Sequence, residues 1–511
     1  MSNKRERRLR KQAEREEKRR REVEAGLVTV VPFVPRNKRK STPNMKSEFK
    51  TVEEEDNARK EALENQVRVF RRLLPGILKS LSFIKDPRRK GSVKYKMKEL
   101  MLYGILMFVH QMESRRKAND TMTMPAFVET MTALFPEIKG TPHADTLANI
   151  LEKMDVDKLE DVTIGLLKDL IRKKKFKRYI QNGRYVIAID GSGKYSRDWQ
   201  FAKECLYRKS GESEKYFVYV LEAALVLGNG VTLPFMSEFL SNDEYDFQDS
   251  AQKQDCELKA FKRLATRMKN NFPGLKITLV LDGLYPNGPV FTLCRKNKWD
   301  FMITLKDGSL KELWEDAKGI MKLEPGNELI QDYGDRRQEF RWANLIEYSY
   351  SRKNQHGTQV TVTEKVNVVV CNENWVEHTM EGEINKTTKF AWVSAKALTM
   401  GNVHKRCNLT GRFRWFIENN VLQTEKCRGY HYEHNYSYDW NAMKGFHHLM
   451  HIAHMLNNLA MITEYLYDYV QKHGFMNTLN FLHDTWKGNW IDKKYAGEFI
   501  KTDNCQIRFA F

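Results

Sequence analysis

Two short apolar segments of the chain each run into an aspartate that is followed by a glycine. Residues 186–189 precede Asp190, and residues 277–281 precede Asp282. Runs of this length that are rich in branched residues predict buried strands. Helical periodicity lies between them, so we predict an α/β core in which helices flank a mixed sheet. The other elements predicted for this core are strands at 217–227, 233–240 and 301–305, and helices at 250–271 and 290–298.

The charge of the chain points to a polyanionic partner. The 511 residues include 86 Lys and Arg against 66 Asp and Glu, a formal net charge of +20. Nucleic acid is the commonest partner for such an excess. Half of it lies in residues 1–50, where 17 basic and 7 acidic groups give 17 − 7 = +10. Residues 1–24 are therefore predicted to be a nucleic-acid-binding arm or, alternatively, a solubilising tail.

Cysteine usage and hydropathy exclude two classes of protein. The seven cysteines include no CxxC pair, which argues against a disulfide framework or a cysteine zinc site and favours a reducing compartment. The longest apolar run, 100–109, is about half of the ~20 residues that a membrane span needs. No signal peptide is visible at the N-terminus. We therefore expect a cytoplasmic chain with no membrane partner.

The character of the sequence changes along the chain, which predicts several regions. The N-terminal part is basic and bears prolines, later parts show helical periodicity, and alternating segments such as 358–370 predict further strands. The predicted regions are a flexible arm and linker (1–59), a helical DNA-binding domain (60–180), the α/β core (181–308 and 396–440), a β-rich insertion (309–395) and a helical C-terminal region (441–511).

A basic cluster follows the helix predicted near residues 162–171. Cations suit the C-terminus of a helix, so charge compensation of the helix dipole is one explanation. Six positive charges exceed that need, which favours contact with DNA phosphates. The six residues are Arg172, Lys173, Lys174, Lys175, Lys177 and Arg178.

Asp190 and Asp282 occupy equivalent places at the ends of predicted strands. Ligands and metals collect at the carboxyl edge of an α/β sheet, and parallel neighbouring strands would bring the two carboxylates close together. A divalent cation relieves their repulsion, and Mg²⁺ favours carboxylates together with water and phosphate oxygens. The alternative is that each Asp-Gly pair forms a simple turn.

A third carboxylate is expected from the helix predicted at 412–426. Arg414, Glu418 and Glu425 share one face of that helix, at spacings of four and seven. The alternative is an ordinary Arg–Glu pair on a solvated face.

Several segments, taken in order, resemble a DDE transposase of the bacterial insertion-sequence type. The resemblance is to the large group with a β-rich insertion between the second Asp and the Glu, and it covers about residues 80 to 460. The matching segments are 86–102, VIAIDGSG (186–193), KQDCELKAFKRL (253–264), ITLVLDGLYPNGPVF (277–291), FMITLK (301–306), RFRWFIENN (412–420) and GYHYEHNYS (429–437).

The resemblance implies a ribonuclease H-like core in which Asp190, Asp282 and Glu418 hold two Mg²⁺ ions, for which Mn²⁺ can substitute. Water would then cut the transposon end, and the exposed 3′-hydroxyl would join it to target DNA. Arg414 and Lys426 would bind backbone phosphate. The implied partner is double-stranded DNA, bound by a homodimer in a synaptic complex. The implied location is the nucleoid of a bacterial cytoplasm.

The sequence departs from one signature of this group, in which Tyr, Arg, Glu and Lys are separated by two, three and six residues. Gly411 stands at the Tyr position and Glu425 at the Lys position, with Lys426 one residue late. Glu425 therefore competes with Glu418 as a ligand. Glu257, at a predicted helix start, is a second competitor.

Two other signals predict less. His447, His448, His451 and His454 have i, i+4 spacing that can hold zinc, but the HExxH pattern is absent, which favours packing or DNA contact. Residues 191–194 (GSGK) lack the spacing of a phosphate loop.

Two rival functions stay open. One is a domesticated transposase-derived nuclease, which would keep the carboxylates but lack mobile ends. The other is a non-catalytic DNA-binding protein on the same fold.

Overall fold

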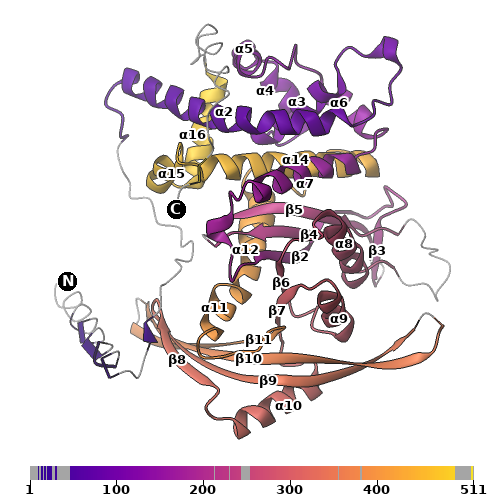
Figure 1. The fold of residues 1–511 in the computed structure, drawn as a ribbon. Helices are drawn as coiled ribbons and strands as arrows, with labels where there is room; N and C mark the ends of the chain where they lie inside the picture. Colours follow the sequence, from indigo (N-terminus) through magenta and orange to yellow (C-terminus); the bar gives the residue numbers. More distant parts are fainter. Residues whose placement is uncertain are drawn as a thin grey trace. The chain divides into compact units, whose positions relative to one another are not determined.

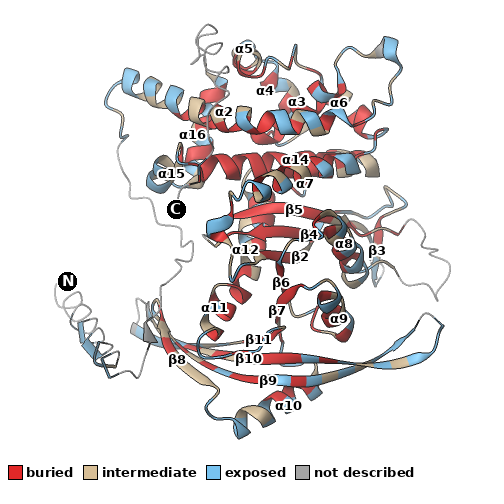
Figure 2. Ribbon diagram, in the orientation of Figure 1, coloured by how far each residue is buried: buried red, intermediate tan, exposed pale blue. Residues whose placement is uncertain are grey.

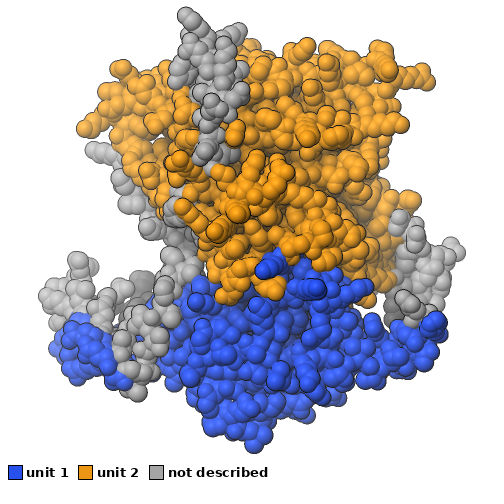
Figure 3. Space-filling model, viewed as in Figure 1, with its two compact units in different colours: residues 1–39, 276–414 blue, residues 40–275, 415–511 orange. Residues whose placement is uncertain are grey.

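The computed structural model describes residues 47–488 except 212, 229–230, 243–253, 355 and 380–381, together with 508–509 and part of 10–30. Much of the predicted basic arm therefore lies outside the described residues. The described chain is a mixed α/β structure with two compact units (Figure 3). The first unit comprises residues 1–39 and 276–414, and the second comprises 40–275 and 415–511.

The N-terminal half of the second unit is helical, as the periodicity predicts. Helix α2 begins after Thr51, whose hydroxyl accepts a hydrogen bond from the Glu54 amide, 3.2 Å away. His143 caps the start of α6, where its Nδ1 accepts a hydrogen bond from the Asp145 amide. The helices are α2 (Val52–Ser82), α3 (Met97–Val109), α4 (Arg115–Met122), α5 (Pro125–Leu134), α6 (Ala144–Leu151) and α7 (Asp157–Arg172).

An antiparallel sheet follows in the same unit. Strand β4 pairs with β2 along one edge, and with β3 and then β5 along the other. The strands predicted at 217–227 and 233–240 are confirmed, whereas β2 is much longer than the predicted 186–189. Helix α8 packs against β4 and β5. The elements are β2 (Tyr185–Arg197), β3 (Leu206–Ser210), β4 (Ser213–Val226), β5 (Thr232–Phe239) and α8 (Glu257–Asn271).

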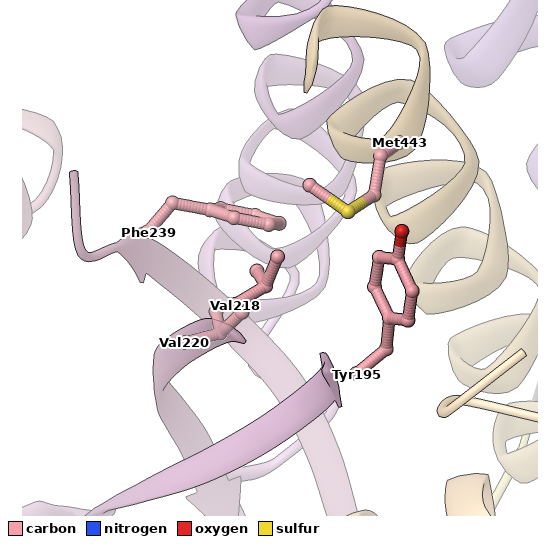
Figure 4. Packing of buried hydrophobic residues seen from close by; sticks show 5 residues of the cluster. All are labelled: Tyr195, Val218, Val220, Phe239 and Met443. Carbon is pink, nitrogen blue, oxygen red and sulfur yellow. The ribbon is translucent and has the colours of Figure 1, made fainter. Parts of the chain in front are cut away.

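Helix α14 (Trp440–Met461) forms the centre of the second unit. It is buried at nearly every position, and it packs against α3, α6 and α7 as well as against β5 (Figures 1 and 2). Met443 of α14 contacts a cluster that includes Val218 and Val220 (Figure 4). Since these valines alternate with outward residues of β4, α14 covers the sheet face to which they point.

Two shorter helices follow α14, which ends at Met461. They are α15 (Tyr467–His473) and α16 (Phe475–Lys487). The helix predicted at 412–426 is present in three parts. They are α12 (Arg414–Ile417), a π-helical segment η4 (Glu418–Leu422) and α13 (Gln423–Cys427).

The first unit contains a mixed sheet. Strands β6 and β7 are parallel, while β7, β11, β10, β9 and β8 follow in antiparallel order. The strands predicted at 277–281, 301–305 and 358–370 are confirmed. The elements are β6 (Ile277–Leu281), α9 (Gly288–Lys296), β7 (Asp300–Thr304), α10 (Lys311–Leu323), β8 (Glu328–Tyr333), β9 (Arg336–Lys353), β10 (Gln359–Thr379), β11 (Gly382–Ser394) and α11 (Val403–Asn408).

Candidate functional site

Asp190 lies in the middle of a strand and not at its end. It pairs with Glu222 of β4, which in turn pairs with Ser237 of β5. Directly opposed residues of antiparallel strands point to the same face, so these three polar side chains form a row on one face of the sheet. The prediction that the strand ends at Asp190 is wrong. The alternative of an Asp-Gly turn is also wrong there, because β2 continues through Gly191.

Gly191 is a glycine because another strand approaches it closely. A Cβ atom at this position would lie 2.5 Å from Cε1 of Tyr219 and 2.7 Å from Oε1 of Glu257. The Tyr219 hydroxyl donates a hydrogen bond to that same carboxylate oxygen, 2.6 Å away. Glu257 is the first residue of α8, as predicted. Because successive side chains of a strand point to opposite faces, Glu257 lies on the face of the sheet opposite to the Asp190 side chain.

The segment that carries Glu418 contains one residue more than a regular helix would need. The Gln423 amide donates to the Glu418 carbonyl, five residues earlier, which defines a π turn. Such a turn shifts every later side chain by about one helical position. Lys426, eight residues after Glu418, therefore takes the place that a seven-residue spacing would give in a regular helix. The one-residue departure from the family signature is absorbed by this turn.

The same shift directs Glu425 into the protein interior. Glu425 is 0% exposed, and its Oε1 lies 2.7 Å from Nδ1 of His454. Glu418 and Lys426 are both partly exposed, and Lys426 pairs with Glu433 at 2.9 Å. Because Glu425 is fully buried against the histidines of α14, it is a poor candidate for the ligand of a solvent-accessible cation.

The predicted histidine cluster faces the polar row. Nε2 of His447 lies 3.3 Å from Oε1 of Glu222, and Nε2 of His451 lies 3.8 Å from Oε2 of the same carboxylate. Nε2 of His451 also lies 3.4 Å from Oε2 of Glu425. One imidazole thus stands between two carboxylates that come from different elements, β4 and α13. Since its partners lie on the face that carries Asp190, the helix of Glu418 packs on that face too.

Lys194 completes this network. Its ammonium group donates to the Tyr432 carbonyl at 3.0 Å and lies 3.4 Å from Nδ1 of His447. Lys194 and His451 thus lie in the same buried network as the two glutamates. Burial lowers the pKa of Lys194 to about 8, against the opposing effect of both glutamates.

The pKa values of the buried pair follow from their contacts. Burial alone would lower the pKa of His451, but Glu425 and Glu222 outweigh burial and raise it. Burial alone would raise the pKa of Glu425, but His451 and His454 lower it to about 2. Each group thus favours the charged form of the other.

The spacing of Glu222, His447 and His451 would also allow a metal ion, since one ligand atom from each lies within 4.8 Å of the others. The ammonium of Lys194 argues against this. It can donate to Nδ1 of His447 only if that atom carries no proton, so that Nε2 is the protonated nitrogen and has no lone pair for a metal. The contacts fit a network of buried hydrogen bonds and ion pairs better than a zinc site.

Asp282 lies in the first unit, directly after β6, as predicted. Its Oδ1 accepts a hydrogen bond from the Leu284 amide at 2.8 Å. Its Oδ2 lies 3.8 Å from the ammonium of Lys306. The aliphatic part of the Lys306 side chain lies close to Gly283. The partly buried carboxylate thus has a cation beside it. Asp190 and Glu418 belong to the second unit.

The predicted basic residues lie at the surface. In the cluster at 172–178, Lys175 is half-buried and the other five basic residues are exposed, with Arg172 paired to Asp169 at 2.8 Å. Arg414 is half-buried at the start of α12.

Sequence reasoning missed Glu222, Ser237 and Tyr432. Glu222 did leave a signal, because it is the one charged residue in the apolar run 217–227. A charge in such a run is expected to have a buried partner. The Tyr432 hydroxyl donates to Oε1 of Glu222 at 3.1 Å.

Comparison with known families adds one finding. Residues 78–166, which reach from the end of α2 into α7, match the family model described as DDE_Tnp_1-associated. This part of the chain is therefore similar to a region associated with DDE-type transposases. No curated protein matches the chain. Among the described residues, no helix is long and apolar enough to cross a membrane.

Proposed function

We propose that the protein is a DNA transposase that cuts transposon ends and joins the 3′-hydroxyl to target DNA. The observation that carries the proposal is the match of residues 78–166 to a family model associated with DDE transposases. The arrangement further along the chain supports it, because the helix of Glu418 is joined through His451 to Glu222, the cross-strand neighbour of Asp190. A ribonuclease H-like core with a β-rich insertion is part of the proposal.

Asp190, Asp282 and Glu418 are the residues that would hold divalent metal ions, with Mg²⁺ as the natural ion. Carboxylates are the ligands that Mg²⁺ prefers, and the two in the second unit do not lie in the fully buried interior. Bound there, such a cation supplies Lewis-acid chemistry at the scissile phosphate. Arg414 and Lys426 are assigned to backbone phosphates beside it.

Two steps account for the activity. In the first, water attacks the phosphorus atom, the P–O3′ bond breaks, and a 3′-hydroxyl is released. In the second, that hydroxyl attacks a phosphate of target DNA and displaces a new 3′-hydroxyl there. A homodimer would hold two ends in register for these steps.

The test uses a plasmid that carries the gene with its native flanking DNA. Purified full-length protein is incubated with it in Mg²⁺, beside the Glu418→Gln variant, and the new ends are sequenced. Discrete cuts at paired repeats, made only by the wild type, are expected. Scattered nicks that the variant lacks would favour the nuclease, and DNA binding without any cut would favour the non-catalytic protein.

DNA affinity is predicted to depend steeply on salt through the basic cluster. Replacing Lys173, Lys174 and Lys177 with Gln should flatten the plot of log affinity against log salt by about 0.9 for each phosphate that the cluster no longer neutralises. Fluorescence anisotropy from low to moderate salt measures this slope. The control replaces Lys311, Lys318 and Lys322, which are exposed on α10, and removes the same charge. Equal slopes for the two triple variants would contradict a phosphate-binding role for the cluster.

A further inference from the structure

Glu425 is the point at which the helix of Glu418 is attached to the interior of the second unit. It is the third residue of α13, directly after the π turn and directly before Lys426. Its two oxygens face His454 at 2.7 Å and His451 at 3.4 Å, both on α14. A π turn is rare within a helix and needs stabilising contacts from its surroundings. The contacts of Glu425 are of that kind.

The register of this helix has two possible states. With the π turn, Glu425 points inward and Lys426 points to the partly exposed side. If the segment closed into a regular helix, each residue beyond the turn would rotate by about 100° relative to Glu418. Glu425 would then leave its histidines, and Lys426 would turn away from the side of the helix that carries Glu418. Only the π register keeps both arrangements.

The same contacts reach the strand of Asp190. His451 lies between Oε2 of Glu425 and Oε2 of Glu222, and Glu222 is the cross-strand neighbour of Asp190. One buried imidazole therefore connects the helix of one proposed metal ligand to the strand pair of another. Within the described residues, Oε2 of each glutamate and Nε2 of His451 have no closer hydrogen-bonding partner.

We propose that Glu425 is a positioning residue, which through His451 and His454 holds the π register that presents Glu418 and Lys426. The proposal rests on the proposed function, because it takes Glu418 as a metal ligand. It assigns Glu425 no contact with metal or DNA. Glu425, which competed with Glu418 for the ligand role, instead holds the helix of Glu418 in place.

A second-site rescue distinguishes this role from a general contribution to stability. Glu425→Gln removes the anchoring charge, so the register is expected to relax and the affinity for Mn²⁺ to fall by at least about tenfold. Deleting the exposed Asn419 removes the extra residue of the π turn. Lys426 then follows Glu418 by seven residues, so a regular helix places it on the same side as Glu418. The deletion should therefore restore Mn²⁺ affinity in Glu425→Gln to within about threefold of the wild type.

Titration of the free Mn²⁺ signal by electron paramagnetic resonance measures this affinity on the full-length chain without DNA. Gln423→Ala, an exposed change in the same helix, is the matched control and should bind as the wild type does. If Glu425→Gln fails to fold, Glu425→Asp keeps the charge but shortens the anchor, and the same loss and rescue are expected. Wild-type affinity in the Glu425 variants, or failure of the deletion to restore it, would overturn the proposal.

Failure of the proposed function gives a different result. Mn²⁺ binding that depends on Glu418 and Glu425, in a protein that cuts no DNA, would sustain the positioning role and refute the transposase. Equal Mn²⁺ affinity in Glu418→Gln and the wild type would overturn the positioning role itself.

Discussion

Replacing Asp190 with Asn is expected to slow DNA cleavage by on the order of 10³-fold while DNA affinity stays unchanged. A metal-bound transition state is stabilised by several kcal/mol, and about 4 kcal/mol corresponds to that factor. Asn has the size of Asp but lacks the charge that the cation requires. The measurement is the single-turnover rate of end cleavage in saturating Mg²⁺.

The fold should tolerate this change. Asp190 lies directly opposite Glu222 in the antiparallel pair, and like charges that face each other across strands cost stability. The melting temperature of Asp190→Asn should therefore equal or slightly exceed that of the wild type. Asp198→Asn, the same chemical change at an exposed position just beyond β2, is the control and should cut normally. A cleavage rate within tenfold of the wild type for Asp190→Asn would refute its catalytic role.

The strands that lead to the candidate carboxylates could be predicted, because a short run of apolar residues indicates a buried strand. Ile277–Leu281 is fully buried and ends at Asp282, as its sequence indicates. The predicted strand before Asp190 is too short, because the glycine that follows Asp190 ordinarily indicates a turn. In the structure, Gly191 instead makes room for the ring of Tyr219, a residue 28 positions away. Local sequence does not record such an approach.

The buried network was beyond prediction for a related reason. The histidine spacing on α14 was visible, but its partners Glu222 and Glu425 come from a strand and from a different helix. Nor could a π turn be recognised from periodicity, since one extra residue resembles an ordinary departure from a signature. The structure explains that departure by the different burial of Glu425 and Lys426.

Replacing Arg406 with Ala is expected to cost the first unit about 3–5 kcal/mol, as breaking a buried ion pair from one side does. Its guanidinium group donates to both oxygens of Asp300 at 2.9 Å, and both side chains are almost fully buried. It also donates to Oγ of Ser394 at 2.9 Å and to the Phe301 carbonyl at 3.1 Å. One side chain of α11 thus joins the start of β7 to the end of β11.

Hydrogen exchange measured by mass spectrometry localises the effect, since the chain has two units and a single unfolding transition is not expected. Amides of β7 and α11 should lose most of their protection in Arg406→Ala. The control is Arg341→Ala, which breaks the exposed pair with Glu328 and should cost about 0–1 kcal/mol. In Arg406→Ala the buried Asp300 carboxylate loses its main partner. Lys396, whose ammonium lies 3.8 Å from it, can compensate only part of that negative charge. Equal protection in the two variants would mean that the surrounding strands, and not the ion pair, hold α11 in place.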